Sequence, residues 1–274
     1  MSPDPRSLIL SLMLGSEARG DAELGVRELI SACALFDLPE NSVRVTLARS
    51  VASGLLVTPR RGAYALGPQA RPLAVEVGRW RQLETQLLDW NGDWIAVHVG
   101  ATGRSDRPAL RARERAFSML GLAEFERGLH LRPNNLVGGA GLLQERLRLL
   151  VTEGAETGTV FVMSELAKAD AERAKRLWDV ATLDANYRDT TARLTAWLEN
   201  APTLPLDRAA RESFQLGHAA IRSLVFDPLL PAPLVDADAR TRFIRTVARF
   251  DDAGKVIWQR FLTHARKLAG QPSA

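Results

Sequence analysis

The sequence predicts an α+β fold, and three observations indicate this class. Apolar residues recur at helical spacing in the N-terminal quarter of the chain, strands and helices alternate in the middle, and helical patterns dominate the C-terminal part. The chain has 274 residues, which is long for one domain and comfortable for two or three. Hydrophobic residues make up 46% of it and charged residues 25%, which is typical of ordinary folded proteins.

Three helices are expected at the N-terminus. The first covers residues 6–14, and the second covers residues 26–36, where apolar side chains recur at helical spacing. Pro39 suits the first turn of a third helix, because proline fits that turn without losing a hydrogen bond. Gly54 stands where glycine commonly ends a helix. The sequence therefore predicts a compact group of three helices before residue 55.

The third helix is expected to be two-sided. Val43, Leu47 and Val51 recur every four residues and should form its buried stripe. At about 100° per residue, small, polar and basic side chains fall on the opposite side or flank it. These residues are Asn41, Ser42, Arg44, Val45, Ala48 and Arg49.

A hairpin is expected directly after this helix. Its strands cover residues 55–58 and 63–66, and the turn between them carries Arg60 and Arg61. Three helices followed by a hairpin are typical of a winged helix-turn-helix. Between residues 38 and 66, four arginines accompany a single acid, Glu40, so this stretch has a local charge of +3, compared with +4 for the whole chain.

This arrangement predicts double-stranded DNA as a partner. The small side chains of the third helix permit close approach to a major groove, and its arginines can reach phosphates or guanine edges. The turn of the hairpin can meet the adjacent backbone or minor groove. The alternative is a solvated arginine face on a protein-interaction module that does not bind DNA. The predicted DNA-binding residues are Asn41, Ser42, Arg44, Val45, Arg49, Arg60 and Arg61.

Four parts are expected along the chain. Residues 1–68 form the winged-helix domain, 69–91 a connector helix, 92–168 a central domain and 169–274 a helical C-terminal domain. The central elements follow the β-α-β-β-α-β order of a ferredoxin-like domain. They are a strand at 92–99, a helix at 107–120, a strand pair within 124–135 broken near Gly128, a helix at 141–150 and a buried strand at 158–163.

The C-terminal part is expected to be helical. A long helical run covers residues 170–200, and its apolar positions suit either packing within the chain, which we favour, or a dimer seam. Further helices are expected at 207–226, 236–251 and 253–268, with the sequence DPLLPAP as a rigid break before the second of them.

The residue types argue against several kinds of chemistry. Cys33 is the only cysteine, so an internal disulfide and a thiolate zinc site are excluded, and its apolar surroundings predict a buried thiol. The four histidines show no metal spacing, and no nucleophile–base motif is recognisable. We therefore expect no cofactor and no enzyme. The chain has no apolar run of about 18 residues and no signal-peptide pattern, so we expect no membrane partner and a cytoplasmic location.

Several stretches, in order along nearly the whole chain, resemble the PaaX-like transcriptional regulators, named for repressors of phenylacetic acid degradation. The resemblance implies a repressor that binds a palindromic operator as a homodimer and is released by an acyl-CoA effector. These stretches are RSLILSLML, ALFDLPENSVRVTLARSVASGLL with the hairpin after it, GLHLRPNNL, RLWDVATLDANY and FDPLLP.

Arg132 is the candidate ligand-binding residue. It stands at an expected strand end beside a turn, where its guanidinium could meet a phosphate or carboxylate of an anionic effector. The alternative is that Arg132 caps a structural turn. The central domain also resembles a CRISPR-associated ferredoxin-like nuclease subunit, but the aspartate expected at the end of the first strand is missing, since residues 97–103 read VHVGATG.

Overall fold

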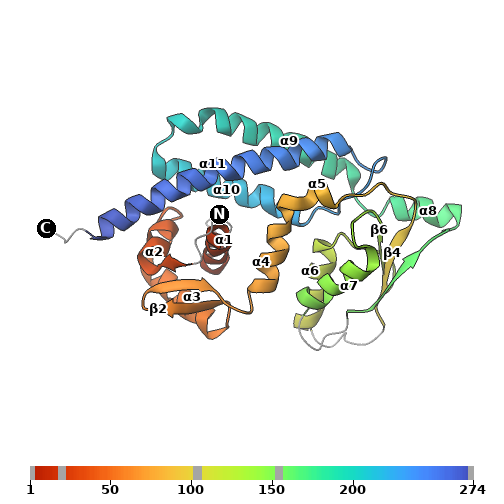
Figure 1. Ribbon diagram of the computed structural model, residues 1–274, viewed down its shortest axis with the longest axis horizontal. Coiled ribbons are helices and arrows are strands. Elements are labelled where there is room, and N and C mark those ends of the chain that lie inside the picture. The colour runs from red at the N-terminus through yellow and green to blue at the C-terminus, as the bar shows by residue number, and fades with distance from the viewer. Residues whose placement is uncertain (1–3, 18–22, 101–106, 152–156, 271–274) are drawn as a thin grey trace. The chain divides into compact units, whose positions relative to one another are not determined.

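The computed structural model describes residues 4–17, 23–100, 107–151 and 157–270 (Figure 1). Helices and two antiparallel sheets, one of three strands and one of four, make up this part of the chain, which agrees with the predicted α+β class.

The chain divides into two compact units, and each is assembled from segments that are distant in the sequence. The domain boundaries expected from the sequence stay a prediction. Unit 1 comprises Met1–Gly78, Arg193–Ile221 and Val247–Ala274, and unit 2 comprises Arg79–Ala192 and Arg222–Thr246.

Unit 1 begins with three helices, a small sheet and a fourth helix. The strands pair in the order β1-β3-β2. The three helices and the hairpin of β2 and β3 agree with the predicted order, whereas β1 was not predicted because its two residues are too short to show a pattern. The elements are α1 (Pro5–Glu17), β1 (Leu24–Gly25), α2 (Val26–Ala34), α3 (Glu40–Ala52), β2 (Leu56–Arg60), β3 (Ala63–Leu66) and α4 (Arg71–Gly78).

The core of unit 1 joins these N-terminal helices to segments near the C-terminus. Apolar side chains from α10 (Leu206–Val225) and from the second half of α11 (Ala237–Gly270) pack into the same cluster as those of α1, α2 and α3. Arg266 of α11 donates a 2.6 Å hydrogen bond to Glu28 of α2. The main members of the cluster are Leu8, Ile9, Leu29, Cys33, Val43, Leu47, Ala210, Trp258, Phe261 and Leu262.

Cys33 confirms the prediction of a buried thiol. Its side chain has no exposed surface, and it is a free cysteine. Burial raises the pKa of the Cys33 thiol to about 12, because the apolar surroundings disfavour the thiolate.

Unit 2 contains the four-stranded sheet, whose strand order is β5-β6-β4-β7. The elements follow one another as β4-α6-β5-β6-α7-β7, which is the β-α-β-β-α-β order expected from the sequence. Before the sheet lie η1 (Arg79–Gln82) and α5 (Leu83–Gln86). The elements of the sheet region are β4 (Trp94–His98), α6 (Arg107–Met119), β5 (Ala123–Glu126), β6 (Leu129–Pro133), α7 (Gly139–Leu150) and β7 (Thr159–Met163).

Both faces of the central strand β4 are buried. Successive side chains of a strand point to opposite faces, so Ile95 and Val97 pack with α6 and α7, which lie together in Figure 1. Trp94 and Ala96 pack on the other face with residues of α8 (Lys168–Lys175). The sheet is therefore the middle layer of unit 2.

A strand was predicted at 158–163 and is present as β7, but the prediction that it is buried was wrong. Strand β7 lies at the edge of the sheet and pairs only with β4 among the described strands. Phe161 is 39% exposed and Val162 is 47% exposed. A short apolar run looks the same in a central strand and in an edge strand, so the sequence could not separate the two.

The helical run expected at 170–200 is broken. It consists of α8 and α9 (Val180–Asn200), and α9 begins where the Asp179 carboxylate accepts hydrogen bonds from the backbone and hydroxyl of Thr182 at 3.0 and 2.6 Å. Tyr187 and Leu194 of α9 are buried within the chain. This agrees with packing within the chain rather than with a dimer seam at these two positions.

The two helices expected at 236–251 and 253–268 are one continuous helix, α11. No proline stands between them, and the pair Ala253–Gly254 is accommodated in the helix interior. The helix expected at 207–226 is α10, and the segment of the DPLLPAP sequence separates α10 from α11 as predicted.

Candidate nucleic-acid interface

Helix α3 is built as a half-buried helix of unit 1. It starts after Pro39, which is extended with ψ of 143°, and ends before Gly54, whose φ of +70° favours glycine. Val43 and Leu47 have no exposed surface and join the core with α1 and α2. The predicted ends of this helix are confirmed to within one residue.

The buried stripe of α3 differs from the prediction at its third position. Val51 is 36% exposed, whereas Ser50 is 2% exposed. A helix has 3.6 residues per turn, so two turns from Val43 the core-facing position is seven residues on and not eight. At this position near the helix end, the backbone carbonyl of Ser50 accepts hydrogen bonds from the Ser53 hydroxyl and from the backbone of Leu55.

The outward side of α3 carries the side chains that the sequence placed there. Asn41, Arg44, Val45 and Arg49 are exposed, with Val45 at 50%, and Ser42 is half-buried. Ala48 is also exposed, so five exposed residues within nine positions leave a continuous strip of the helix surface outside the core. This strip, together with Ser42, is called the α3 face below.

Arg44 is held by an ion pair on the α3 face. Its Nε and Nη2 atoms lie 2.8 and 2.7 Å from Oε1 of Glu40, one helical turn earlier. Both side chains are more than half exposed, so the pair is screened by solvent and contributes at most about 1 kcal/mol to stability. Arg49 makes no ion pair or hydrogen bond with a side chain among the described residues. The two arginines therefore differ in how freely they could meet a phosphate.

The hairpin turn is shorter than predicted. Arg60 is the last residue of β2 rather than part of the turn, and the turn consists of Arg61 and Gly62. The Nε atom of Arg60 donates a 2.8 Å hydrogen bond to Glu23, which precedes β1. The sequence did not predict this contact, because Glu23 stands directly before β1, a strand that was not predicted.

Arg61 is the exposed basic residue of the turn. Like Arg49, it has no ion pair or side-chain hydrogen bond with any residue in the described ranges. The hairpin thus carries Arg61, which has no carboxylate partner among the described residues, and Arg60, which is paired with Glu23. Helix α3 likewise carries Arg49, which has no such partner, and Arg44, which is paired with Glu40. All seven residues predicted to bind DNA lie in unit 1, on α3 or on the hairpin.

Arg132 belongs to unit 2 and is 2% exposed. Its guanidinium donates hydrogen bonds to the carbonyls of Leu120 at 2.6 Å and Pro133 at 3.2 Å, and to the side chain of Asn135 at 3.3 Å. Burial, and to a smaller extent the charge of Arg146, lowers the pKa of Arg132 to about 9. These bonds fit the alternative that Arg132 supports a turn, and a contact with a ligand stays a prediction.

A buried polar network extends from Asn135 to the segment after α10, and the sequence reasoning missed it. Asn135 donates to the carbonyl of Leu229 at 2.7 Å, and Asp227 accepts from the Leu229 backbone and from the Tyr187 hydroxyl, both at 2.7 Å. Burial raises the pKa of Asp227, although the hydrogen bonds from Tyr187 and Leu229 act in the opposite direction. The sequence feature that could have indicated this network is Asp227 in the stretch FDPLLP, where apolar residues and prolines surround a single aspartate.

Among the described residues, no group of three or more histidine, cysteine, aspartate or glutamate side chains could hold a metal ion. Asp93 lies before β4, at the opposite end from His98, and Asp106 lies outside the described residues. In the described parts of the chain, no helix combines the length and apolar character needed to span a bilayer.

Comparisons with known proteins give one family. Residues 4–70 match the family described as PaaX-like protein, and residues 178–260 match the PaaX-like protein C-terminal domain. Together the two matches span more than half of the chain. A comparison with curated proteins found no match.

A solved structure with a similar fold is the uncharacterized protein Rv0674 from Mycobacterium tuberculosis. It has 24% sequence identity and a TM-score of 0.52, and the likeness covers 91% of this chain and 98% of that chain. At this identity, the likeness shows the fold alone.

Proposed function

This chain belongs to the PaaX-like protein family, and from that premise we propose that it is a DNA-binding transcriptional regulator. In this proposal, residues 1–68 act as a winged helix-turn-helix whose recognition helix is α3 and whose wing is the hairpin of β2 and β3. The observation that carries the proposal is the α3 face, on which Val45 and Arg49 are exposed while Val43 and Leu47 fix the opposite side in the core.

Each predicted residue has a physical role in this proposal. Asn41 and Ser42 lie in the first turn of α3, where short polar side chains can hydrogen-bond to base edges or phosphates. Val45 offers an apolar surface of the kind that contacts the thymine methyl group. Arg49 and Arg61 reach guanine or phosphate directly, because no carboxylate among the described residues holds them.

Arg44 and Arg60 have a different role, since each would exchange a carboxylate for a phosphate on binding. Glu40 and Glu23 partly neutralise them in the free protein. This lowers nonspecific attraction to DNA, because fewer unpaired charges face the phosphate backbone. We propose that these two pairs favour tight binding only where DNA fits both α3 and the wing.

The remaining parts of the proposal come from the resemblance to the family. The chain acts as a repressor, binds a palindromic operator as a homodimer and is released by an acyl-CoA-like effector, and it carries out no catalysis. A ferredoxin-like central domain and a helical C-terminal domain provide the dimer contacts and the effector site. An effector can release DNA only through a difference in its affinity for the two conformations, typically about 1–3 kcal/mol.

A salt titration of DNA binding tests the proposal. Fluorescence anisotropy with the DNA upstream of the protein's own gene should show binding that weakens linearly on a log–log plot as salt rises. Arg49→Ala should lower affinity or reduce the salt slope by about one unit. The matched control is Arg148→Ala on the exposed side of α7, which should change neither. The absence of salt-dependent binding to any DNA would reject the proposal.

A protein-interaction module without DNA binding is the second candidate. Three valines favour it, since Val45, Val51 and Val57 of the same module are each at least 36% exposed. Exposed apolar side chains are more typical of protein contacts than of phosphate contacts. The same titration separates the two candidates, because a protein-interaction module would show no specific DNA complex.

A further inference from the structure

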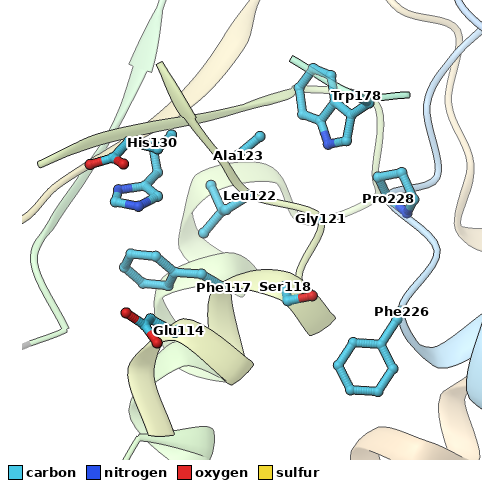
Figure 2. A pocket seen from close by; sticks show the side chains of 11 residues that line it. Glu114, Phe117, Ser118, Gly121, Leu122, Ala123, His130, Trp178, Phe226 and Pro228 are labelled. Carbon is cyan, nitrogen blue, oxygen red and sulfur yellow. The ribbon is translucent and has the colours of Figure 1, made fainter. Parts of the chain in front are cut away.

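Unit 2 contains a pocket of about 290 Å³ (Figure 2). Its walls come from the end of α6, the turn into β5, strand β6, the loop before α9 and the segment after α10. Stretches around residues 120, 178 and 227, which are distant in the sequence, therefore meet at one place. The eleven lining residues are Glu114, Phe117, Ser118, Gly121, Leu122, Ala123, Glu124, His130, Trp178, Phe226 and Pro228.

Aromatic rings form much of the lining. Phe117 and His130 meet edge to face with ring centroids 4.6 Å apart, and Figure 2 shows them together on one side of the pocket. Trp178, Phe226 and Pro228 lie on the other side in the same view. Trp178 is itself held in place, because its ring stacks parallel to that of Trp94 of β4 with centroids 6.3 Å apart. The pocket thus offers ring faces and edges to a planar ligand.

The floor of the pocket is fixed by close backbone packing. Gly121 has a φ of +70°, and a Cβ atom at this position would lie 2.8 Å from the Cα atom and the carbonyl oxygen of Pro228. Directly before it, the Leu120 carbonyl accepts the 2.6 Å hydrogen bond from Arg132. Directly after Pro228, Leu229 is held by Asn135. These contacts indicate that the pocket is formed before any ligand arrives.

The polar groups of the pocket are mainly hydrogen-bond acceptors. Among the eleven lining residues, all of them described, the charged side chains are Glu114 and Glu124. Glu124 accepts a 3.1 Å hydrogen bond from the Gly128 backbone, whereas the Glu114 carboxylate has no partner among the described residues. Outside the lining, Arg222 lies over the Phe226 ring, 5.2 Å from its centroid.

His130 adds a buried nitrogen without a partner. Its Nδ1 atom is inaccessible to solvent and makes no hydrogen bond with a described residue. Burial lowers the pKa of His130, Glu124 raises it and Arg113 lowers it further, so the ring is neutral near pH 7. A neutral imidazole whose Nε2 atom carries the proton presents Nδ1 as an acceptor. Because Nδ1 has no accessible surface, a ligand in the pocket would meet the His130 ring rather than this atom.

We propose that this pocket binds a small aromatic amine, with the ring between the aromatic side chains and the ammonium group near the Glu114 carboxylate. The size fits, since an apolar cavity of about 150 Å³ holds benzene and the remaining space accommodates a short side chain. Acceptors line the pocket and the ligand supplies donors. Two carboxylates disfavour an anion, so this ligand class differs from the acyl-CoA effector and the site is additional to the proposed function.

Three matched probes test the ligand class by isothermal titration calorimetry of the full chain near neutral pH. Benzylamine, benzyl alcohol and benzoate share one ring and differ in charge. Benzylamine should bind most tightly, benzyl alcohol more weakly and benzoate least. Saturable binding of benzylamine that exceeds that of benzoate supports the proposal. No saturable binding of benzylamine, or binding of benzoate at least as tight, would overturn it.

Two variants test the location. Glu114→Gln should weaken benzylamine by about two- to fivefold, as expected for an exposed ion pair, and leave benzyl alcohol unchanged. The matched control, Glu145→Gln on the exposed side of α7, should leave both unchanged. Ser118→Trp, at an exposed helix position, should fill the pocket and remove binding of every probe.

Retained benzylamine binding in a folded Ser118→Trp protein, or equal effects of Glu114→Gln and Glu145→Gln, would place the site elsewhere and overturn the proposal. If Ser118→Trp fails to fold by circular dichroism, the glutamate pair decides alone. These measurements use no DNA, so a negative result leaves the proposed DNA-binding function untouched.

Discussion

The hydroxyl of Tyr187 donates a 2.7 Å hydrogen bond to the carboxylate of Asp227, and both side chains are buried. The second carboxylate oxygen accepts from the backbone of Leu229, whose φ is +53°. This left-handed conformation is unfavourable for leucine, so the carboxylate stabilises a strained backbone. The bond between Tyr187 and Asp227 thereby joins α9 to the segment between α10 and α11.

Tyr187→Phe should destabilise the protein by about 1–3 kcal/mol. The substitution removes one of the two hydrogen bonds to Asp227 and leaves a buried carboxylate oxygen unpaired. Urea denaturation followed by circular dichroism measures the free energy of unfolding. The matched control is Tyr64→Phe, since the Tyr64 hydroxyl has no hydrogen-bond partner among the described residues, and it should change stability by less than about 0.5 kcal/mol. Equal losses in the two variants would contradict this role of Tyr187.

Cys33 should react with a thiol reagent only when unit 1 unfolds. The thiol is fully buried and its pKa is raised to about 12, so both access and thiolate formation are suppressed in the folded state. The rate of labelling by dithionitrobenzoate should rise together with the unfolded fraction as urea increases. Fast labelling without denaturant would show that the α1–α2–α3 core opens easily.

The same thiol should make stability depend on alkaline pH. The pKa of Cys33 is higher in the folded state than in the unfolded state, so the folded state holds its proton longer. Its contribution to stability is complete below the unfolded pKa of about 8.5 and is lost as pH rises from there toward 12. Between about pH 8.5 and 10, the free energy of unfolding should therefore fall less in Cys33→Ala than in the native protein. Urea denaturation at each pH measures this difference.

Glu40→Gln should strengthen DNA binding if α3 is the recognition helix. The change removes a negative charge from the α3 face and releases Arg44 from its ion pair. We expect higher affinity and a salt slope that is steeper by about one unit, measured by fluorescence anisotropy. Glu145→Gln makes the same charge change on α7 and serves as the control. Unchanged affinity in Glu40→Gln would argue against contact between this part of α3 and DNA.

Gly121→Ala and Gly141→Ala should have opposite effects on stability. At Gly121, a methyl group would meet Pro228 at 2.8 Å in a left-handed backbone conformation, so a loss of about 1–3 kcal/mol is expected. At Gly141, within α7, a Cβ atom would have nothing within 4 Å, and alanine should stabilise the helix by about 0.5–1 kcal/mol. Thermal or urea unfolding of both variants measures the difference. A tolerated Gly121→Ala would mean that the floor of the pocket adapts.

The protein should be a homodimer in solution. A palindromic operator has two half-sites about one DNA turn apart, or a multiple of that, and one winged helix covers one of them. Because Tyr187 and Leu194 are buried within a single chain, these two positions of α9 are not available as a dimer surface. Sedimentation at micromolar concentration, with and without DNA, should report a dimer. A monomer under both conditions would contradict the expectation.

The two sides of α3 could be predicted from the sequence because one periodic pattern decides them. Val43 and Leu47 set the buried side, and the exposed residues opposite followed from the helix geometry. The error at Val51 arose from counting eight residues for two turns instead of seven. The order of strands and helices in the central domain could likewise be predicted, since strands and helices differ in length and are separated by turn residues.

Other features depend on contacts that no local pattern records. The two residues of β1 form a strand only because Ala63 and Tyr64 of β3 lie beside them. The exposure of Phe161 follows from the position of β7 at the sheet edge, which strand order decides. The pocket could not be predicted from the sequence for the same reason, since Phe117, Trp178 and Phe226 meet only in the folded chain.

The shared core of unit 1 sets the order in which a newly made chain can finish folding. Leu8 and Cys33 are synthesised long before Trp258 and Phe261, which pack in the same cluster but stand more than 200 residues later in the sequence. At about 5–20 residues per second, the N-terminal helices wait on the order of ten seconds or longer for these partners. During that time their apolar surface is exposed, so nascent chains of this protein are expected to be clients of ribosome-associated chaperones. The same dependence means that a fragment cut after residue 78 would keep the α3 sequence but lack part of the core that supports it.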